Sequence, residues 1–299
     1  MYALVLITLL SVNAIATTDI IYGEDGRVEI HAVESKEIQS LGNSVAARVS
    51  HWSLDIKEDN FSFNDVSLLS DMWAQGVCSD EKFATQPTIA DCTGFLIAPD
   101  LLVTAGHCAL DVEGISRNDA TFECQSNSWI FDYKADSGNT KLEDVNLNNL
   151  YNCEEVVFGK LTEKEDFAII KLDREVRDRK PLKLRTEGKV QLEEDIFVIG
   201  HPSGLPMKYT GDSIVKENSD DNYFSTNLDT FGGNSGSPVF NARTLEVEGI
   251  LVRGRTDYVD SEVDGQFCMR VNVCDQNGEN CLVQDEDIDG EHVNRVNEI

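Results

Sequence analysis

The sequence predicts an all-β fold made of many short strands. Apolar runs of strand length follow one another from Cys78 onward, and turn residues separate them. Helical periodicity is scarce, since the two best segments, 160–164 and 192–195, are too short to count as helices. The 299 residues, 41% of them hydrophobic, are enough for one large β domain or two smaller ones with a sizeable core. A barrel or sandwich architecture is therefore expected.

The clearest strand signal is a hairpin. Phe95-Leu96-Ile97 and Leu101-Leu102-Val103 are apolar runs on either side of the turn residues Pro99-Asp100. Five further strand-length runs follow in the chain: 169–172, 196–199, 239–240, 247–252 and 267–271.

The N-terminal segment, 17–75, carries fewer signals. Residues 20–25 predict a short strand that enters a turn, and residues 45–49 predict either a strand or a short helix. The segment is either a pro-segment or an N-terminal part of the mature fold. Residues 1–16 predict a secretory signal peptide, because an apolar run precedes the small-x-small sequence Ala14-Ile15-Ala16. The positive residues usual at a signal's start are missing, since the first Lys or Arg is Arg27.

The C-terminal residues 284–299 are acidic and lack an apolar period, which predicts a loose tail. The run from Asp285 to Gly290 has the form of the opening of a calcium loop. The twelfth position of such a loop needs a bidentate Glu, but here it is Val296. A solvated acidic tail is therefore preferred to a calcium site.

The charge excludes some partners. With 25 basic and 54 acidic residues, the formal net charge is −29. Such a surface repels nucleic acid and anionic lipid, so neither is expected to bind. The charge identifies no substrate.

The eight cysteines are even in number, as expected for disulfides in an exported chain. The sequence has no CxxC pair and no Cys/His cluster with zinc spacing, so no metal site is expected. The pairs Cys124–Cys153, Cys274–Cys281 and Cys78–Cys268 are the expected ones, with Cys92–Cys108 discussed below.

A serine between glycines is the first candidate for chemistry. It stands in the sequence Asp229-Thr230-Phe231-Gly232-Gly233-Asn234-Ser235-Gly236-Ser237-Pro238. The glycines allow a substrate carbonyl to approach the main chain, where N–H groups can bind an oxyanion. Alone, this sequence is equally compatible with a polar turn.

His107 and Asp166 are the candidate base and acid. His107 lies in Thr104-Ala105-Gly106-His107-Cys108, and a Cys92–Cys108 disulfide would tie this loop to the preceding hairpin. Asp166 stands directly before an apolar strand, where its carboxylate can be partly buried and still accept an N–H from an imidazole.

The chain order His107, Asp166, Ser235 resembles that of the trypsin-like serine proteases. The Gly-Asn-Ser-Gly-Ser-Pro sequence is similar to that of their secreted bacterial branch, which includes the glutamyl endopeptidases. The segments Cys92–Ile97 and Gly200–Gly204 also resemble that branch, so the resemblance runs from about Asp91 to Gly254.

The resemblance implies two six-stranded antiparallel β-barrels, about 76–180 and 181–283, with the active site in the cleft between them. It implies that His107, Asp166 and Ser235 are catalytic and that the N–H groups of Gly233 and Ser235 form the oxyanion hole. The expected activity is that of a secreted or periplasmic serine endopeptidase. It needs no cofactor, acts on polypeptides and is expected to be a monomer.

Asn234 departs from the pattern of the pancreatic enzymes. Asn234 stands where pancreatic enzymes have the Asp that receives the new N-terminal amine, so activation by that ion pair is not expected. If Ile20 or Ile21 becomes a mature terminus, it is expected to pack elsewhere.

Specificity is predicted from Asp229 and Thr230. Asp229, six residues before Ser235, resembles the base of the trypsin specificity pocket, which favours cleavage after Arg or Lys. The His that glutamyl endopeptidases use is absent from Gly249-Ile250-Leu251, although glutamyl-type or other specificity stays the alternative. Arg253, in the strand expected to line the cleft, would repel a basic side chain.

A second class of function is an inactive protease-like binding module or adhesin. Such relatives commonly lack a member of the triad, whereas this sequence keeps all three residues, so catalysis is the preferred interpretation.

Overall fold

The computed structural model describes residues 20–64, 66–72, 75–135, 145–283 and 290–298. The signal peptide predicted at 1–16 and most of the calcium-like sequence, 285–289, lie outside these residues. In the described part of the chain, no helix is both long enough and apolar enough to cross a membrane.

Barrel one closes through six antiparallel strands in the order β13-β11-β3-β8-β9-β14, with β14 pairing back onto β13. The strands are β3 (Val45–Ser50), β8 (Cys92–Ala98), β9 (Leu101–Thr104), β11 (Asn127–Phe131), β13 (Leu150–Leu161) and β14 (Asp166–Leu172). A further strand, β10 (Gly114–Asp119), pairs with β13 outside the closed ring. The predicted hairpin is β8 and β9.

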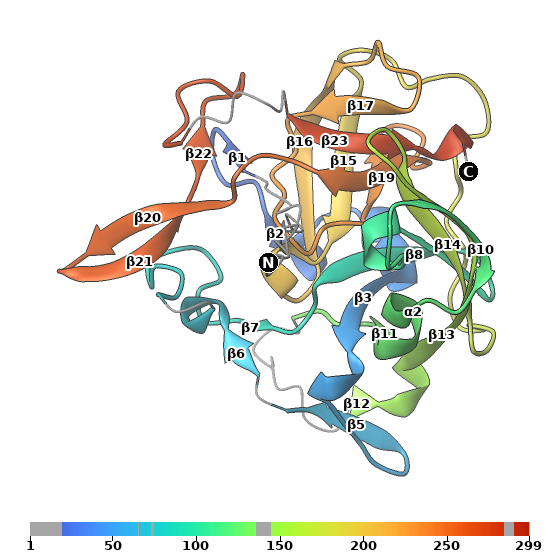
Figure 1. The fold of residues 1–299 in the computed structure, drawn as a ribbon. Helices are drawn as coiled ribbons and strands as arrows, with labels where there is room; N and C mark the ends of the chain where they lie inside the picture. Colours follow the sequence, from blue (N-terminus) through green and yellow to red (C-terminus); the bar gives the residue numbers. More distant parts are fainter. Residues whose placement is uncertain (1–19, 65, 73–74, 136–144, 284–289, 299) are drawn as a thin grey trace, which may run out of the picture.

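Barrel two closes in the order β15-β18-β19-β23-β17-β16, with β15 pairing onto β16. Its strands are β15 (Asp195–Gly200), β16 (Lys208–Glu217), β17 (Tyr223–Thr226), β18 (Pro238–Asn241), β19 (Val247–Arg253) and β23 (Glu291–Arg295). A two-residue strand, β2 (Val28–Glu29), extends this sheet at β16. The expectation of two six-stranded antiparallel barrels is thus confirmed, and Figure 1 shows the two one above the other.

The alternation of side chains along a strand explains how the barrels pack together. On β14, Ala168 and Ile170 lie in the core of barrel one, whereas Phe167 belongs to a second core between the barrels. Phe197 and Phe240 of barrel two meet that shared core, and their rings stack at 4.8 Å. The start of β14 is therefore held against barrel two.

The barrels extend beyond their predicted bounds at both ends. Val45–Ser50 forms strand β3 in the middle of the barrel-one sheet, before the expected start at about 76, which agrees with the alternative that this segment is part of the mature fold. The predicted loose tail fails, because Glu291–Arg295 forms β23 between β17 and β19. Burial explains both results: Ala46 and Val293 have no exposed surface. Each strand completes a barrel that would otherwise have an open edge.

An insertion separates β19 from β23. Its main feature is a hairpin of β20 (Tyr258–Val263) and β21 (Gln266–Val271), which projects from the body of the molecule in Figure 1. The remaining helices and strands are α1 (Lys36–Leu41), α2 (Phe122–Ser126), β1 (Ile21–Tyr22), β4 (Leu54–Ile56), β5 (Asn60–Phe63), β6 (Ser67–Leu68), β7 (Pro87–Thr88), β12 (Val145–Asn146) and β22 (Val273–Cys274).

The eight cysteines form four disulfides, in the four pairs expected from the sequence: Cys78–Cys268, Cys92–Cys108, Cys124–Cys153 and Cys274–Cys281. The first of these ties the projecting hairpin to a segment 190 residues earlier in the chain.

Candidate active site

His107 and Asp166 form a hydrogen-bonded pair on barrel one. His107 lies in the 3-10 turn η5 (Gly106–Cys108) that follows β9, and Asp166 is the first residue of β14. One Asp166 oxygen, Oδ1, accepts the backbone N–H of His107 at 3.0 Å, and Oδ2 lies 2.8 Å from Nδ1 of the ring. Because a carboxylate only accepts, Nδ1 carries the hydrogen and Nε2 is the ring nitrogen available as a base.

Gly106 allows this approach. A Cβ at that position would lie 2.4 Å from the carbonyl oxygen of Lys160 and 3.0 Å from Oδ1 of Asp166. Any larger residue would therefore push the His107 turn away from the strand that carries the acid.

The surroundings keep Asp166 ionised. Only 4% of the residue is exposed, and burial by itself raises the pKa of a carboxyl. The charge of His107, its two hydrogen bonds and the charge of Arg253 outweigh this effect and hold the pKa of Asp166 below its ordinary value. The carboxylate can therefore stabilise a positive charge on the imidazole at neutral pH.

The Ser235 loop comes from barrel two but is fixed to barrel one by Thr93. The N–H of Thr93 donates to the carbonyl of Ser235 at 2.8 Å, and its hydroxyl donates to the carbonyl of Gly233, also at 2.8 Å. The same hydroxyl oxygen accepts the N–H of His201 at 3.2 Å. Thr93 has no exposed surface, so these bonds do not compete with water.

Other neighbours hold the two peptide groups of Gly232. The carbonyl of Gly232 accepts the N–H of Ser203 at 2.6 Å, and the N–H of Gly232 donates to Oδ2 of Asp257 at 3.0 Å. Within the described chain, the N–H groups of Gly233 and Ser235 have no hydrogen-bond partner. These are the two donors that the sequence assigned to an oxyanion hole.

Positive φ angles make the loop possible. Gly233 has φ +97°, and Gly236 has φ +90°. A Cβ on Gly236 would lie 2.0 Å from the carbonyl oxygen of Thr93, so the close contact between the barrels requires glycine there.

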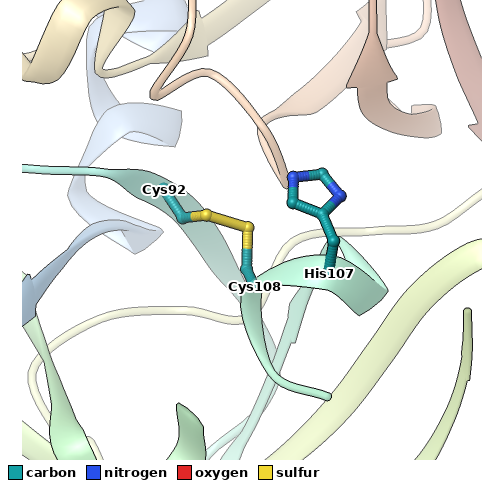
Figure 2. A group of neighbouring side chains, drawn as sticks. All are labelled: Cys92, His107 and Cys108. Carbon is teal, nitrogen blue, oxygen red and sulfur yellow. A yellow bond between two sulfur atoms is a disulfide. The ribbon is translucent and has the colours of Figure 1, made fainter. Parts of the chain in front are cut away.

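The Cys92–Cys108 disulfide lies beside His107, as Figure 2 shows. Potential ligand atoms of Cys92, His107 and Cys108 fall within 4.8 Å of one another, a spacing that could suggest a metal site. The two sulfurs are bonded to each other, so neither is a thiolate that could bind a metal. The disulfide also lies close to the Ser235 loop, since Sγ of Cys108 is 3.8 Å from the carbonyl oxygen of Ser235.

Ser235 and His107 thus lie on opposite sides of the contact between the barrels. In the described chain no hydrogen bond joins their side chains. Such bonds are often long before substrate binds and tighten in the complex.

Comparison with known proteins assigns the chain to a family. The family model described as "Trypsin-like peptidase domain" matches residues 92–250, which is more than half of the chain and includes His107, Asp166 and Ser235. The chain belongs to the trypsin-like peptidases. As a member of this family it is a serine endopeptidase, as predicted.

The comparison with solved structures found several proteases. A Glu endopeptidase in complex with MPD has 18% identity and a TM-score of 0.48, and the match covers 84% of this chain and 94% of that one. The VesB protease of Vibrio cholerae has 13% identity and a TM-score of 0.47, with 93% of this chain and 64% of that one covered. At these identities neither likeness transfers a specificity to this peptidase. No match to the sequence was found among curated proteins.

Asp229 and Thr230, the predicted specificity residues of the peptidase, are both buried. Asp229 is 5% exposed, and its two oxygens accept the N–H groups of Tyr22 and Gly26, each at 2.7 Å. The hydroxyl of Thr230 donates to Glu291 at 2.7 Å. Both predicted specificity residues are thus engaged by other parts of the chain.

Asn234 makes its hydrogen bonds within its own loop and not with the N-terminal segment. Oδ1 of Asn234 accepts the hydroxyl of Ser237 at 3.3 Å, and the N–H of Asn234 donates to the carbonyl of Phe231. Ile21, in contrast, donates its N–H to the carbonyl of Asn272.

Three residues near the site were missed by the sequence analysis: Thr93, Glu291 and Asn294. Thr93 directly follows the half-cystine Cys92, but nothing local indicates that its hydroxyl reaches Gly233, 140 residues away. Glu291 and Asn294 stand in the segment predicted to be a tail, so no signal distinguished them.

Proposed function

We propose that the chain is a secreted serine endopeptidase that hydrolyses peptide bonds through an acyl-enzyme on Ser235. His107 acts as the general base and Asp166 as the residue that orients and stabilises it. The observation that carries the proposal is the double hydrogen bond of Asp166 to the backbone N–H and Nδ1 of His107. That arrangement fixes the tautomer in which Nε2 is unprotonated.

The chemistry follows from these groups. Oγ of Ser235 attacks the scissile carbonyl carbon, and its proton passes to Nε2 of His107. The unpartnered N–H groups of Gly233 and Ser235 supply donors for the oxyanion of the tetrahedral intermediate. The C–N bond then breaks as His107 gives its proton to the leaving amine, which leaves an ester on Ser235. A water molecule attacks the ester, again losing a proton to His107, and the acid product leaves as Oγ regains a proton. No step requires a cofactor.

Specificity needs a different basis from the one that the sequence suggested. Cleavage after Arg or Lys was predicted from a free carboxylate on Asp229, but both oxygens accept backbone N–H groups. A basic side chain would have to displace Tyr22 or Gly26 from that carboxylate. We propose instead that Asp229 holds the N-terminal segment against barrel two.

Secretion is supported by the four disulfides, because such bonds persist in oxidising compartments outside the cytosol. The proposed location is extracellular or periplasmic, the proposed substrates are polypeptides, and the proposed active form is a monomer. Neither nucleic acid nor membrane is a proposed partner, because the net charge is −29.

Labelling by a fluorophosphonate tests the proposal. The purified, disulfide-bonded protein should react, and mass spectrometry should locate the adduct on Ser235, with no reaction in Ser235→Ala. A correctly folded protein that takes no label would contradict the proposal and favour a binding module. A peptide panel varied only before the scissile bond then assigns specificity. A preference for Arg or Lys would contradict the role given to Asp229.

A further inference from the structure

The side chain of Asn294 connects barrel two to the triad acid. Asn294 lies on β23 and is 4% exposed. Its Oδ1 accepts the backbone N–H of Asp166 at 2.8 Å. Its Nδ2 donates to the carbonyl of Lys164 at 2.9 Å and is 3.4 Å from the carbonyl oxygen of Asn222.

This network fixes the orientation of the amide. The acceptor oxygen faces an N–H, and the donor nitrogen faces two carbonyl oxygens. A flipped amide would set its NH₂ group against the N–H of Asp166 and its oxygen against both carbonyls. Because the group is buried, that mismatch would not be repaired by water. One orientation of Asn294 is therefore strongly preferred.

The position of Asn294 on its strand explains why it reaches barrel one. Its neighbour Val293 points into the core of barrel two. Side chains alternate along a strand, so Asn294 points outward, toward the loop that leads into β14. It bonds to Lys164 in the loop before β14 and to Asp166, the first residue of that strand.

In the strand ladder Asp166 pairs with Leu161 of β13, and the side chain of Asn294 holds the N–H of Asp166 from barrel two. Its carboxylate must meet both the backbone N–H and Nδ1 of His107, so a small shift of the strand start would weaken both bonds. A displacement of about 1 Å in a catalytic group can cost about 100-fold in rate. An anchor on the N–H of Asp166 itself is the most direct way to prevent such a shift.

We propose that Asn294 is a positioning residue for the triad: it holds the start of β14 so that the Asp166 carboxylate stays in register with His107. The inference rests on the proposed function. It also makes the last strand of barrel two, which lies outside the family match at 92–250, part of the catalytic apparatus.

The test compares two variants with a matched control. Asn294→Ala removes the amide, and Asn294→Leu replaces most of its volume without an acceptor. The control is Asn241→Ala, which removes another fully buried asparagine of barrel two with three side-chain hydrogen bonds, to Glu194, Arg243 and Thr244. None of these partners touches the triad.

Peptide hydrolysis per folded molecule is the first readout. Both Asn294 variants should lose about 10- to 100-fold in kcat with KM within about threefold of wild type, because binding is kept and alignment is lost. Asn241→Ala should lower the melting temperature by a similar amount and leave kcat within about twofold. Equal kcat losses in Asn241→Ala, or a normal kcat in Asn294→Leu, would overturn the inference.

The NMR signal of the Nδ1 proton of His107 is the second readout, and it requires no turnover. The hydrogen-bonded proton should be resolved downfield in wild type and Asn241→Ala, and lost or shifted upfield in Asn294→Ala. An unchanged signal in Asn294→Ala would overturn the inference. Failure of wild type to label with fluorophosphonate would instead contradict the proposed function, so the two failures are distinguishable.

Discussion

The hydroxyl of Thr93 donates a hydrogen bond to the carbonyl of Gly233 at 2.8 Å, across the contact between the two barrels. Thr93 belongs to β8, the strand of barrel one that pairs with β9, and Gly233 carries one of the two proposed oxyanion donors. A buried residue of barrel one therefore helps to hold the Ser235 loop of barrel two. The alignment of the proposed base and nucleophile then depends on this bond as well as on the packing of the barrels.

Replacing Thr93 with Val should reduce kcat by about 10-fold and change KM little, because the shape is kept while the loop loses its anchor. The free energy of unfolding should fall by about 1–3 kcal/mol, since buried groups of Gly233 and His201 are left unpaired. Steady-state kinetics and urea unfolding measure the two effects.

Ser44→Ala is the control, because Ser44 is also buried and its hydroxyl donates to the carbonyl of Lys180, without contact to the Ser235 loop. It should lose about 1 kcal/mol of stability and keep its kcat. Equal kcat in wild type and Thr93→Val would contradict the role given to this bond.

Gly236→Ala should lower stability and activity far more than the positive φ of Gly236 alone implies. The new Cβ would lie 2.0 Å from the carbonyl oxygen of Thr93 and 2.4 Å from Oγ1 of Thr104. Gly265→Ala is the matched control, because Gly265 has a similar φ of +81° but no atom within 4 Å of the position that a Cβ would take.

The control should lose about 1–2 kcal/mol of stability and keep its activity. Gly236→Ala should lose more stability and at least about 100-fold in kcat/KM, because the loop must move off barrel one. Similar values for the two variants, measured by urea unfolding and peptide hydrolysis, would rule out the steric explanation.

Asp229 should make stability depend on pH. Burial, only partly offset by hydrogen bonds from Tyr22 and Gly26, raises the pKa of Asp229 from 3.8 to about 6. The folded state therefore holds this proton more tightly than the unfolded state. The resulting stabilisation is complete below about pH 4 and is lost as pH rises to about 6. The difference of about two pKa units corresponds to about 3 kcal/mol at most.

Urea unfolding of wild type and Asp229→Asn between pH 4 and pH 7 measures this contribution. The wild-type free energy of unfolding should fall relative to that of the variant over this range. Parallel curves would show that Asp229 titrates normally in the folded protein.

The Cys92–Cys108 disulfide should support both stability and activity. Replacing both cysteines with Ala should lower the free energy of unfolding by about 3 kcal/mol, as expected for a loop of this length. The same double replacement of Cys124 and Cys153 should cost a similar amount. Only the first pair adjoins His107, so only its loss should lower kcat, by about 10-fold. A kcat loss shared by both double variants would mean that the effect is general.

The motifs around His107, Asp166 and Ser235 were predictable from sequence because each is local. The triad chemistry requires a few residue types at short spacing, next to apolar strands that the pattern reveals. Three of the disulfides join cysteines at most 29 residues apart. Cys78–Cys268, 190 residues apart, was expected because these two cysteines remained, and the two-barrel fold was expected from the resemblance.

The last strand of barrel two could not be predicted in this way. Glu291–Arg295 has one aliphatic residue, Val293, and the buried side chains of Glu291 and Asn294 bond to partners far away in the sequence. Thr230 donates to Glu291, and Asp166 donates to Asn294, contacts that span 61 and 128 residues. The bond of Asp229 to Tyr22 could not be predicted for the same reason, since Tyr22 lies 207 residues earlier.

The catalytic role of Ser235 is tested most directly by the hydrolysis of an unstructured polypeptide by wild type, Ser235→Ala and Ser128→Ala. Ser128 is a fully buried serine of barrel one that bonds to Asn152, away from the site. We expect Ser235→Ala to lose at least about 1,000-fold in kcat, as triad removal does, while Ser128→Ala keeps wild-type activity. Hydrolysis by Ser235→Ala at the wild-type rate would contradict the assignment of Ser235 as the nucleophile.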